Sequence, residues 1–320
     1  MKNLLLSLFC VLSSVSFLKT LSAEPTTLRS ESSCNVLSFS GGGSFGAVEV
    51  GILDKIKLPI GYDLITGISA GGLNAGFLSY FHSLDKTNPN MFAQGVTNLK
   101  NIYAGLTNDD VYDRHLAQVS RSWSYYDTVP LHKTIDSKLA PLAYKGQPKP
   151  VLIGSTNLNM GALQIFRFDE ESKLRQSQIM MATSAIPLVF PPQVIDGSHY
   201  VDGGAIANEI LSGIESFLPT CTDFNITFIS ASGKLDPVAA SEIDTLEEYV
   251  RRLANVVMTD FNNELAEISG MPDCSSKGVI HYCYPVGDYL SEYSSMDFSY
   301  GKELYDIGYN HFTCETLKYC

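Results

Sequence analysis

The sequence has no run of lysine and arginine residues, and only 18% of its 320 residues are charged. Acidic residues outnumber basic residues by 34 to 22, which gives a formal net charge of −12. Because recognition of a phosphate backbone needs clustered positive charge, the chain lacks the electrostatic signature of a nucleic-acid-binding protein. The same absence argues against polybasic attachment to anionic lipid, but it leaves hydrophobic docking to a membrane open.

Low-complexity stretches, internal repeats and breaks in composition are also absent. The hydrophobic fraction of 45% excludes a disordered chain, a coiled coil, a collagen-like repeat and a small disulfide-dense knot. A chain of this length can bury a large core. Without a break in composition, one domain is a better interpretation than two.

Residues 1–23 have the pattern of a secretory signal peptide. Lys2 supplies the positive start, residues 4–18 are apolar or small, and a small-residue cleavage site ends at Ala23. The apolar stretch is too short for a spanning helix. We therefore predict a mature chain of residues 24–320 that is secreted or enters the lumen of the secretory pathway.

Two other windows without charge, 64–81 and 178–195, are long enough for spanning helices. The first contains four glycines and the second contains three prolines. Such residues favour buried strands, turns and helices, so we predict no transmembrane span.

Cysteine usage agrees with export. Cys10 falls in the predicted signal peptide, and an even set of cysteines in an exported chain predicts three disulfides without fixing their connectivity. No C-x2-C pair with a nearby histidine pair suggests a metal site. The sequon at Asn225 is a possible glycosylation site. The remaining cysteines, of which the last four suggest a stapled C-terminal end, are Cys34, Cys221, Cys274, Cys283, Cys314 and Cys320.

Apolar periodicity predicts strands that alternate with helices. This order favours a three-layer α/β/α sandwich with a mainly parallel central sheet. The segment 85–148, between the second expected helix and the third expected strand, is longer and more polar than the other connections and contains helical patches. The expected strands are 35–40, 62–68, 151–157, 163–168, 224–230 and, last, 279–285. The expected helices are 47–56, 70–81, 173–183, 244 to about 268 and, last, 302–312.

The motif Gly67-Ile68-Ser69-Ala70-Gly71 lies between a predicted buried strand and a predicted helix. In that context G-x-S-x-G is typical of a nucleophile elbow, where a sharp turn exposes the serine hydroxyl above the sheet edge. The helix that follows directs its N-terminal N–H groups toward developing negative charge. The alternative is a helix-capping serine in a tight turn.

A glycine-rich loop, Gly41-Gly42-Gly43-Ser44-Phe45-Gly46, follows the first predicted strand. Consecutive glycines let backbone N–H groups converge on an oxyanion or a phosphate. The loop also fits the G-x-G-x-x-G dinucleotide pattern, which requires an acidic residue near the end of the second strand. That strand ends in Ile68-Ser69, so acyl transfer is favoured over nucleotide binding.

A serine nucleophile needs a base, and Asp202 is the best candidate. It precedes Gly203 and Gly204 after a short apolar strand, so a tight turn holds its carboxylate, although such a turn alone is often only structural. Partial desolvation raises the basicity of a carboxylate while glycine N–H groups keep it ionised. None of the six histidines has a distinctive setting; they are His82, His115, His132, His199, His281 and His311.

In this order and spacing, the glycine loop, the elbow and the Asp202-Gly203-Gly204 turn resemble the patatin-like phospholipase family. The stretch 182–191 is similar to the family's approach to its aspartate turn, and residues 299–312 are similar to its last helix. The resemblance covers about residues 36–312. It implies the patatin-like fold, a lipid substrate at a membrane or micelle surface, and no metal or cofactor.

Carried onto this chain, the resemblance implies Ser69 as nucleophile and Asp202 as general base. The oxyanion loop spans Gly41, Gly42, Gly43, Ser44 and Gly46, with the N–H groups of the second to fourth of these as donors. Gly67 and Gly71 shape the elbow, and Gly203 and Gly204 shape the aspartate turn. The family usually has Arg or Lys where this chain has Phe45, which leaves the preference for a phosphate-bearing head group open.

The expected function is therefore a secreted carboxylic ester hydrolase of the phospholipase A or lipid acyl hydrolase type. One alternative is an α/β-hydrolase esterase with a Ser-Asp-His triad, in which His281 or His311 would be essential. Another is a lumenal storage or lipid-binding protein with little chemistry. Trp123, Tyr125 and Tyr126 either rim an acyl pocket, touch a lipid surface or, the better interpretation, pack in the core.

Overall fold

The computed structural model describes residues 33–56, 62–84, 90–113, 124–143, 148–233 and 275–320, together with Thr245 and Arg252. The predicted signal peptide, His115, Trp123, Cys274 and the helix expected from residue 244 lie outside these residues. No helix in the part of the chain that the structure describes is long and apolar enough to cross a bilayer.

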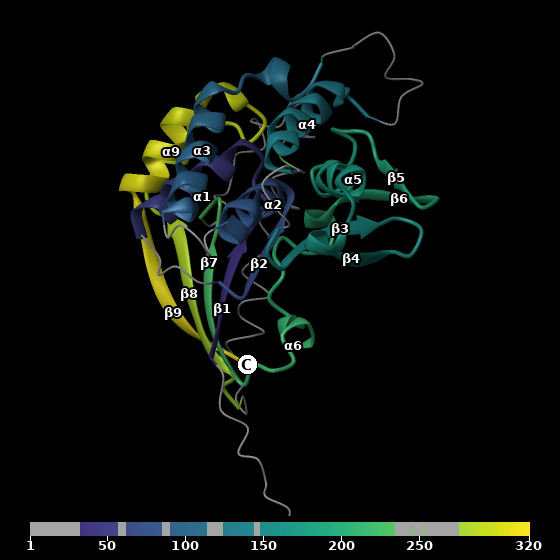
Figure 1. Cartoon of the computed structure of the whole chain (residues 1–320). Helices are drawn as coiled ribbons and strands as arrows, with labels where there is room; N and C mark the ends of the chain where they lie inside the picture. The colour runs from purple at the N-terminus through teal and green to yellow at the C-terminus, as the bar shows by residue number, and fades with distance from the viewer. Residues whose placement is uncertain are drawn as a thin grey trace, which may run out of the picture. The chain divides into compact units, whose positions relative to one another are not determined.

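A nine-stranded sheet forms the centre of the described residues, in the order β5-β6-β3-β2-β1-β7-β8-β9, with β4 paired to β3 (Figure 1). The pairs from β3 through β2, β1 and β7 to β8 are parallel, whereas both edges are antiparallel. The strands are β1 (Ser33–Phe39), β2 (Leu64–Ile68), β3 (Val151–Asn157), β4 (Ala162–Arg167), β5 (Gln193–Ile195), β6 (Ser198–Asp202), β7 (Asp223–Ile229), β8 (Gly278–Pro285) and β9 (Phe312–Tyr319). The predicted α/β/α architecture with a mainly parallel sheet is confirmed, and the sheet is mixed because both edges are antiparallel.

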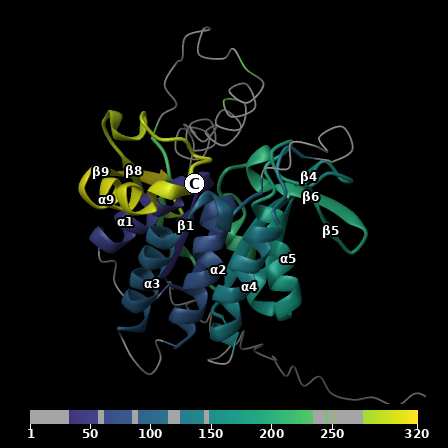
Figure 2. The same cartoon turned by 90° about the horizontal axis from the view of Figure 1, so that it is seen from above.

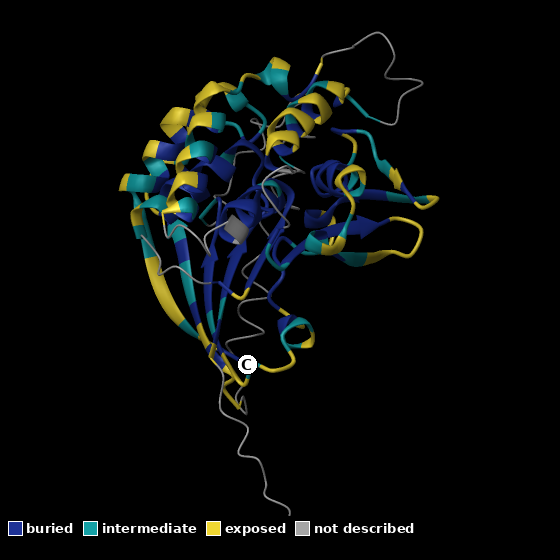
Figure 3. Cartoon of the chain, in the orientation of Figure 1, coloured by how far each residue is buried: buried dark blue, intermediate teal, exposed yellow. Residues whose placement is uncertain are grey.

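Helices cover the sheet because the central strands are apolar on both sides and buried along their length (Figure 3). Figure 2 shows α1, α3, α2, α4 and α5 in a row. Residues of this row form one apolar core, and residues 210–214, which lead into α6, pack in a second core with β1, β2 and β7. The helices are α1 (Gly46–Ile56), α2 (Ser69–Leu84), α3 (Met91–Gly105), α4 (Val129–Ala143), α5 (Lys173–Thr183), α6 (Ile214–Phe217) and α9 (Gly301–Asn310).

Two predictions about the C-terminal end need correction. The strand expected to be the last is followed by β9, which pairs antiparallel with β8 along eight residue pairs. The last helix therefore ends at Asn310, before the predicted residue 312. Periodicity missed β9 because it is an edge strand in which polar residues alternate with single apolar ones and half of the residues are exposed, so it contains no apolar run.

Disulfides connect neighbouring strands. Cys34 at the start of β1 bonds Cys221, just before β7, and Cys283 in β8 bonds Cys314 in β9. Cys320 is also disulfide-bonded. The expectation of a disulfide-stapled C-terminal end is confirmed by the bond between β8 and β9. Asn225 is half-buried in β7, and its amide donates to Asn35 Oδ1 at 2.9 Å; its glycosylation stays a prediction.

The sheet brings three loops to one edge. β1 and β2 are parallel neighbours, so the glycine loop after β1 and Ser69 after β2 leave the sheet at the same side. Ile68 pairs with Gly154, and the next residue of β3, Ser155, pairs with Asp202 at the end of β6. Asp202 therefore reaches the edge where Ser69 lies, although 133 positions separate them in the sequence.

Candidate active site

Ser69 lies at a sharp turn between β2 and α2 with a φ of 54°. This left-handed conformation is rare for a residue with a side chain, and it occurs where the surrounding structure holds the backbone in place. Here the Ser69 N–H donates to Thr183 Oγ1 at 2.8 Å, and that hydroxyl donates to the Gly154 carbonyl at 2.6 Å. The elbow is thus tied to both α5 and β3.

The two elbow glycines are required by close backbone approach. A Cβ on Gly67 would lie 2.3 Å from the carbonyl oxygen of Gly71, and a Cβ on Gly71 would lie 2.2 Å from that of Ser40. The Gly71 N–H donates to the same Ser40 oxygen at 3.1 Å. This bond joins the elbow to the start of the glycine loop.

The glycine loop has fewer open N–H groups than its sequence suggests. The Gly41 N–H donates to Asn208, and the Ser44 N–H donates to the Ser295 carbonyl at 2.8 Å. The Gly46 N–H is used within the loop's own turn. Only Gly42 and Gly43, among the loop residues described, have N–H groups without a hydrogen-bond partner. These two N–H groups are therefore free to donate to an oxygen bound beside Ser69.

Asp202 is buried, with 1% of its surface exposed. Oδ1 accepts the Gly204 N–H at 2.9 Å, whereas Oδ2 has no well-aligned partner within the described residues. Burial raises the pKa of Asp202 to about 7, while the nearby Ser69 hydroxyl and the Gly204 N–H act in the opposite direction. A carboxyl group with this pKa is poised to exchange a proton near neutral pH.

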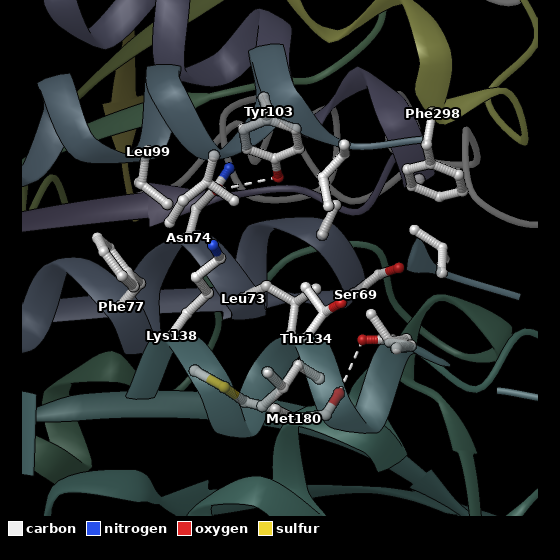
Figure 4. Close-up of a pocket in the computed structure, with 18 of the residues that line it drawn as sticks. Ser69, Leu73, Asn74, Phe77, Leu99, Tyr103, Thr134, Lys138, Met180 and Phe298 are labelled. Carbon is white, nitrogen blue, oxygen red and sulfur yellow. Dashed lines mark hydrogen bonds between the residues drawn. The ribbon is translucent and has the colours of Figure 1, made fainter. Parts of the chain in front are cut away.

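An apolar pocket begins at Ser69 and Gly43 and encloses about 850 Å³, including the part open to solvent. Figure 4 shows Ser69 toward one end, near Phe298, with Phe77 and Lys138 at the other. The lining comes mainly from α2, α3 and α4, the last two from the polar region where the sequence indicated only helical patches. Such a pocket suits a hydrocarbon chain.

Tyr125 and Tyr126 do not line this pocket. Tyr126 instead packs against the core beside Tyr112, with ring centroids 4.4 Å apart. The prediction that these aromatics belong to the core is confirmed for Tyr126.

None of the histidines in the described ranges lines the pocket at Ser69. His82 is buried against Tyr62 and Phe92, and burial lowers its pKa to about 4. His281 in β8 faces Thr316 in the edge strand β9, and His311 stacks on Tyr289. The described residues therefore offer no histidine to a Ser-Asp-His triad.

The amino-acid sequence matches the model of one protein family. Residues 37–213, more than half of the sequence, match the family model of the patatin-like phospholipases. The chain belongs to this family. The match contains the glycine loop, the elbow and the aspartate turn, and family membership supports a lipid hydrolase activity. A comparison with curated proteins found no match.

A comparison with solved structures found distant matches. VipD from Legionella pneumophila is 12% identical with a TM-score of 0.37, and the alignment covers 88% of this chain and 68% of VipD. Human GIVD cytosolic phospholipase A2 is 12% identical with a TM-score of 0.39, over 86% of this chain and 56% of that one. ExoU from the Pseudomonas aeruginosa ExoU–SpcU complex is 13% identical with a TM-score of 0.30, and the alignment covers 90% of this chain and 54% of that one.

Sequence reasoning missed a buried polar network behind the glycine loop of this phospholipase-family chain. Glu49 in α1 is fully buried and lies 3.2 Å from Ser40 Oγ and 3.0 Å from Asn74 Nδ2. Tyr103 donates to Asn74 Oδ1 at 3.0 Å. Burial raises the pKa of Glu49 well above its usual value. The only sequence signal was a lone acid on an apolar helix face.

Replacing Glu49 by alanine is expected to destabilise the fold by about 2–4 kcal/mol, because it leaves a cavity and strips Asn74 of a buried acceptor. Glu49→Gln should cost much less, since an amide reproduces the neutral acid's donor and acceptor. Urea unfolding at pH 6 and pH 9 measures both. Because the folded-state pKa is raised, wild-type stability should fall as pH rises, and that slope should be smaller in Glu49→Gln. Equal losses in the two variants would contradict the network.

Proposed function

We propose that the protein is an exported serine lipid acyl hydrolase in which Ser69 and Asp202 form a catalytic dyad. One observation carries the proposal: a strained serine and a buried carboxyl group with a pKa near 7 meet beside two open amides, at one end of an apolar pocket. Each catalytic part is supplied by the chain itself, so neither metal nor cofactor enters the scheme.

The reaction begins when Asp202 accepts the proton of the Ser69 hydroxyl as Oγ attacks the ester carbonyl carbon. The N–H groups of Gly42 and Gly43 stabilise the oxyanion of the tetrahedral intermediate. Collapse of the intermediate breaks the bond to the alcohol, which takes its proton from Asp202 and leaves an acyl-enzyme. Water then attacks the acyl carbonyl, gives a proton to Asp202, and releases the fatty acid while Ser69 Oγ recovers its proton.

The apolar pocket is proposed to hold the acyl chain, because it starts at Ser69 and is lined by aliphatic and aromatic side chains. The alcohol portion would then remain outside. Phe45 packs against the core rather than offering a cation to a phosphate. Phospholipid, galactolipid and triacylglycerol are therefore all candidate substrates at a membrane or micelle surface.

Export is part of the proposal. The predicted signal peptide leaves residues 24–320 as one mature domain, and disulfides such as Cys34–Cys221 suit an oxidising compartment. Mass spectrometry of the mature N-terminus would test cleavage near Ala23.

The proposed activity is tested by a fluorophosphonate probe followed by peptide mass spectrometry, and by product analysis on the three lipid classes. We expect adduct formation on Ser69 and release of free fatty acid from at least one class. A lipid-binding protein of the same fold would bind lipid without labelling or turnover. Labelling at another serine would overturn the assignment of the nucleophile.

A further inference from the structure

A segment outside the family match completes the candidate active site. Residues 294–298, here named the strap, lie between β8 and α9, whereas the family model ends at residue 213. The Ser295 carbonyl accepts the Ser44 N–H at 2.8 Å, and the Ser294 carbonyl accepts the Ser44 hydroxyl at 3.1 Å. A Cβ on Gly43 would lie 2.2 Å from the Ser295 oxygen. The strap therefore packs directly on the oxyanion loop.

The other end of the strap contributes to the acyl pocket. Phe298 lines the pocket, and Figure 4 shows it toward the end where Ser69 lies. Its ring makes an edge contact with Tyr112, with centroids 6.3 Å apart. One short segment thus touches both the loop that would bind the oxyanion and the wall that would contact the acyl chain.

Asn108 holds the strap in this position. Its Nδ2 donates to Asp297 Oδ1 at 3.1 Å, and its Oδ1 accepts the Phe298 N–H at 2.8 Å. Asn108 begins a short 3-10 turn that a capping box fixes, because Asp110 accepts from both the N–H and the hydroxyl of Thr107. The two hydrogen bonds of the Asn108 side chain therefore fix the strap to this rigid turn.

Tyr112 provides a second attachment. Its hydroxyl donates to the Met296 carbonyl at 2.9 Å, and its ring packs against Tyr126 and Phe190. The strap is thus bonded on one side to residues 108–112 and on the other to the oxyanion loop.

We propose that Asn108 is a positioning residue for catalysis, which acts through the strap to set the oxyanion loop and the adjoining wall of the acyl pocket. The inference rests on the proposed acyl hydrolase function. The Ser44 N–H is used as an anchor, so that the Gly42 and Gly43 N–H groups stay aimed at the reacting oxygen. Displacement of such donors by about 1 Å can cost on the order of 10²-fold in rate.

The test compares Asn108→Ala with Asn101→Ala, a control on the exposed surface of α3 outside the strap contacts. Hydrolysis of a soluble short-chain 4-nitrophenyl ester and the second-order rate of fluorophosphonate labelling are measured for the full-length mature enzyme. In Asn108→Ala we expect kcat and the labelling rate to fall together by at least tenfold, with KM for the short ester changed less than threefold. Asn101→Ala should match wild type in both rates.

Normalisation to folded protein, by near-UV circular dichroism, separates positioning from a loss of structure. A merely structural role would lower the labelled fraction but leave the rate per folded molecule unchanged, and this outcome would overturn the proposal. A rise in rate would also overturn it, because it would make the strap an inhibitory cover. If Asn108→Ala does not fold, Tyr112→Phe keeps the aromatic ring and removes the hydroxyl that donates to Met296, and a fall of about threefold or more in both rates is expected.

Failure of the underlying function would be recognisable separately. If the wild-type enzyme neither hydrolyses the ester nor reacts with the probe, the acyl hydrolase assignment itself is wrong. If wild type is active and Asn108→Ala is equally active, only the role of the strap is wrong.

Discussion

Replacing Ser69 by alanine is expected to lower kcat for ester hydrolysis by about 10⁴-fold or more, since the variant has no nucleophile to form an acyl-enzyme. The fold should be retained, because the bond from the backbone N–H to Thr183 does not depend on the hydroxyl. Turnover of a chromogenic ester and of the preferred lipid measures the loss. Residual turnover within tenfold of wild type would contradict the assignment.

A matched variant tests the elbow itself without relying on activity. Ser69 has a φ of 54°, a conformation that costs an L-residue roughly 1–2 kcal/mol and costs glycine little. Ser69→Gly should therefore be as inactive as Ser69→Ala but more stable, with a higher midpoint of thermal unfolding. If it were less stable than Ser69→Ala, the strained turn would be absent in solution.

Asp202→Asn is expected to lower kcat by about 10²–10⁴-fold, because an amide cannot accept the hydroxyl proton. Asparagine keeps the size of the side chain, and its carbonyl oxygen can still accept the Gly204 N–H. Loss of activity with a retained near-UV spectrum would therefore report chemistry rather than unfolding. Unchanged turnover would exclude Asp202 as the base.

The pH profile gives a second test of Asp202. Only the ionised carboxylate accepts a proton, so wild-type kcat/KM should rise with pH through an apparent pKa of about 7. The residual activity of Asp202→Asn should lack this limb. A wild-type limb near pH 4 would indicate that the catalytic carboxylate is not desolvated.

Stability should change in the opposite direction to activity. Burial raises the folded-state pKa of Asp202 above its ordinary value of 3.8 to about 7. The contribution of Asp202 to the free energy of unfolding is therefore fully present below about pH 4, declines between the two pKa values, and is lost above about pH 7. Asp202→Asn removes the buried charge, so its unfolding midpoint at pH 8 should exceed that of wild type. A lower midpoint at pH 8 would show that the ionised form is well solvated or paired.

The central elements and the elbow were predictable because their signals are local. Apolar runs mark β1, β2, β3 and β7, which are buried within the sheet. The glycines of the elbow follow from backbone crowding within the turn. By contrast, β9 was missed because an edge strand with an exposed face needs no apolar run.

The amino-acid sequence alone determined the family, the order of the three motifs and the chemical types of the candidate nucleophile, base and oxyanion donors. Only the tertiary structure decided that Gly42 and Gly43 have open N–H groups while Ser44 does not, and that Thr183, Glu49 and the strap support the site. The physical reason is the separation along the sequence of the residues that interact. A turn is dictated by residues a few positions apart, whereas the hydrogen-bond partners of a backbone amide and the desolvation of a carboxyl group depend on segments that meet only after folding.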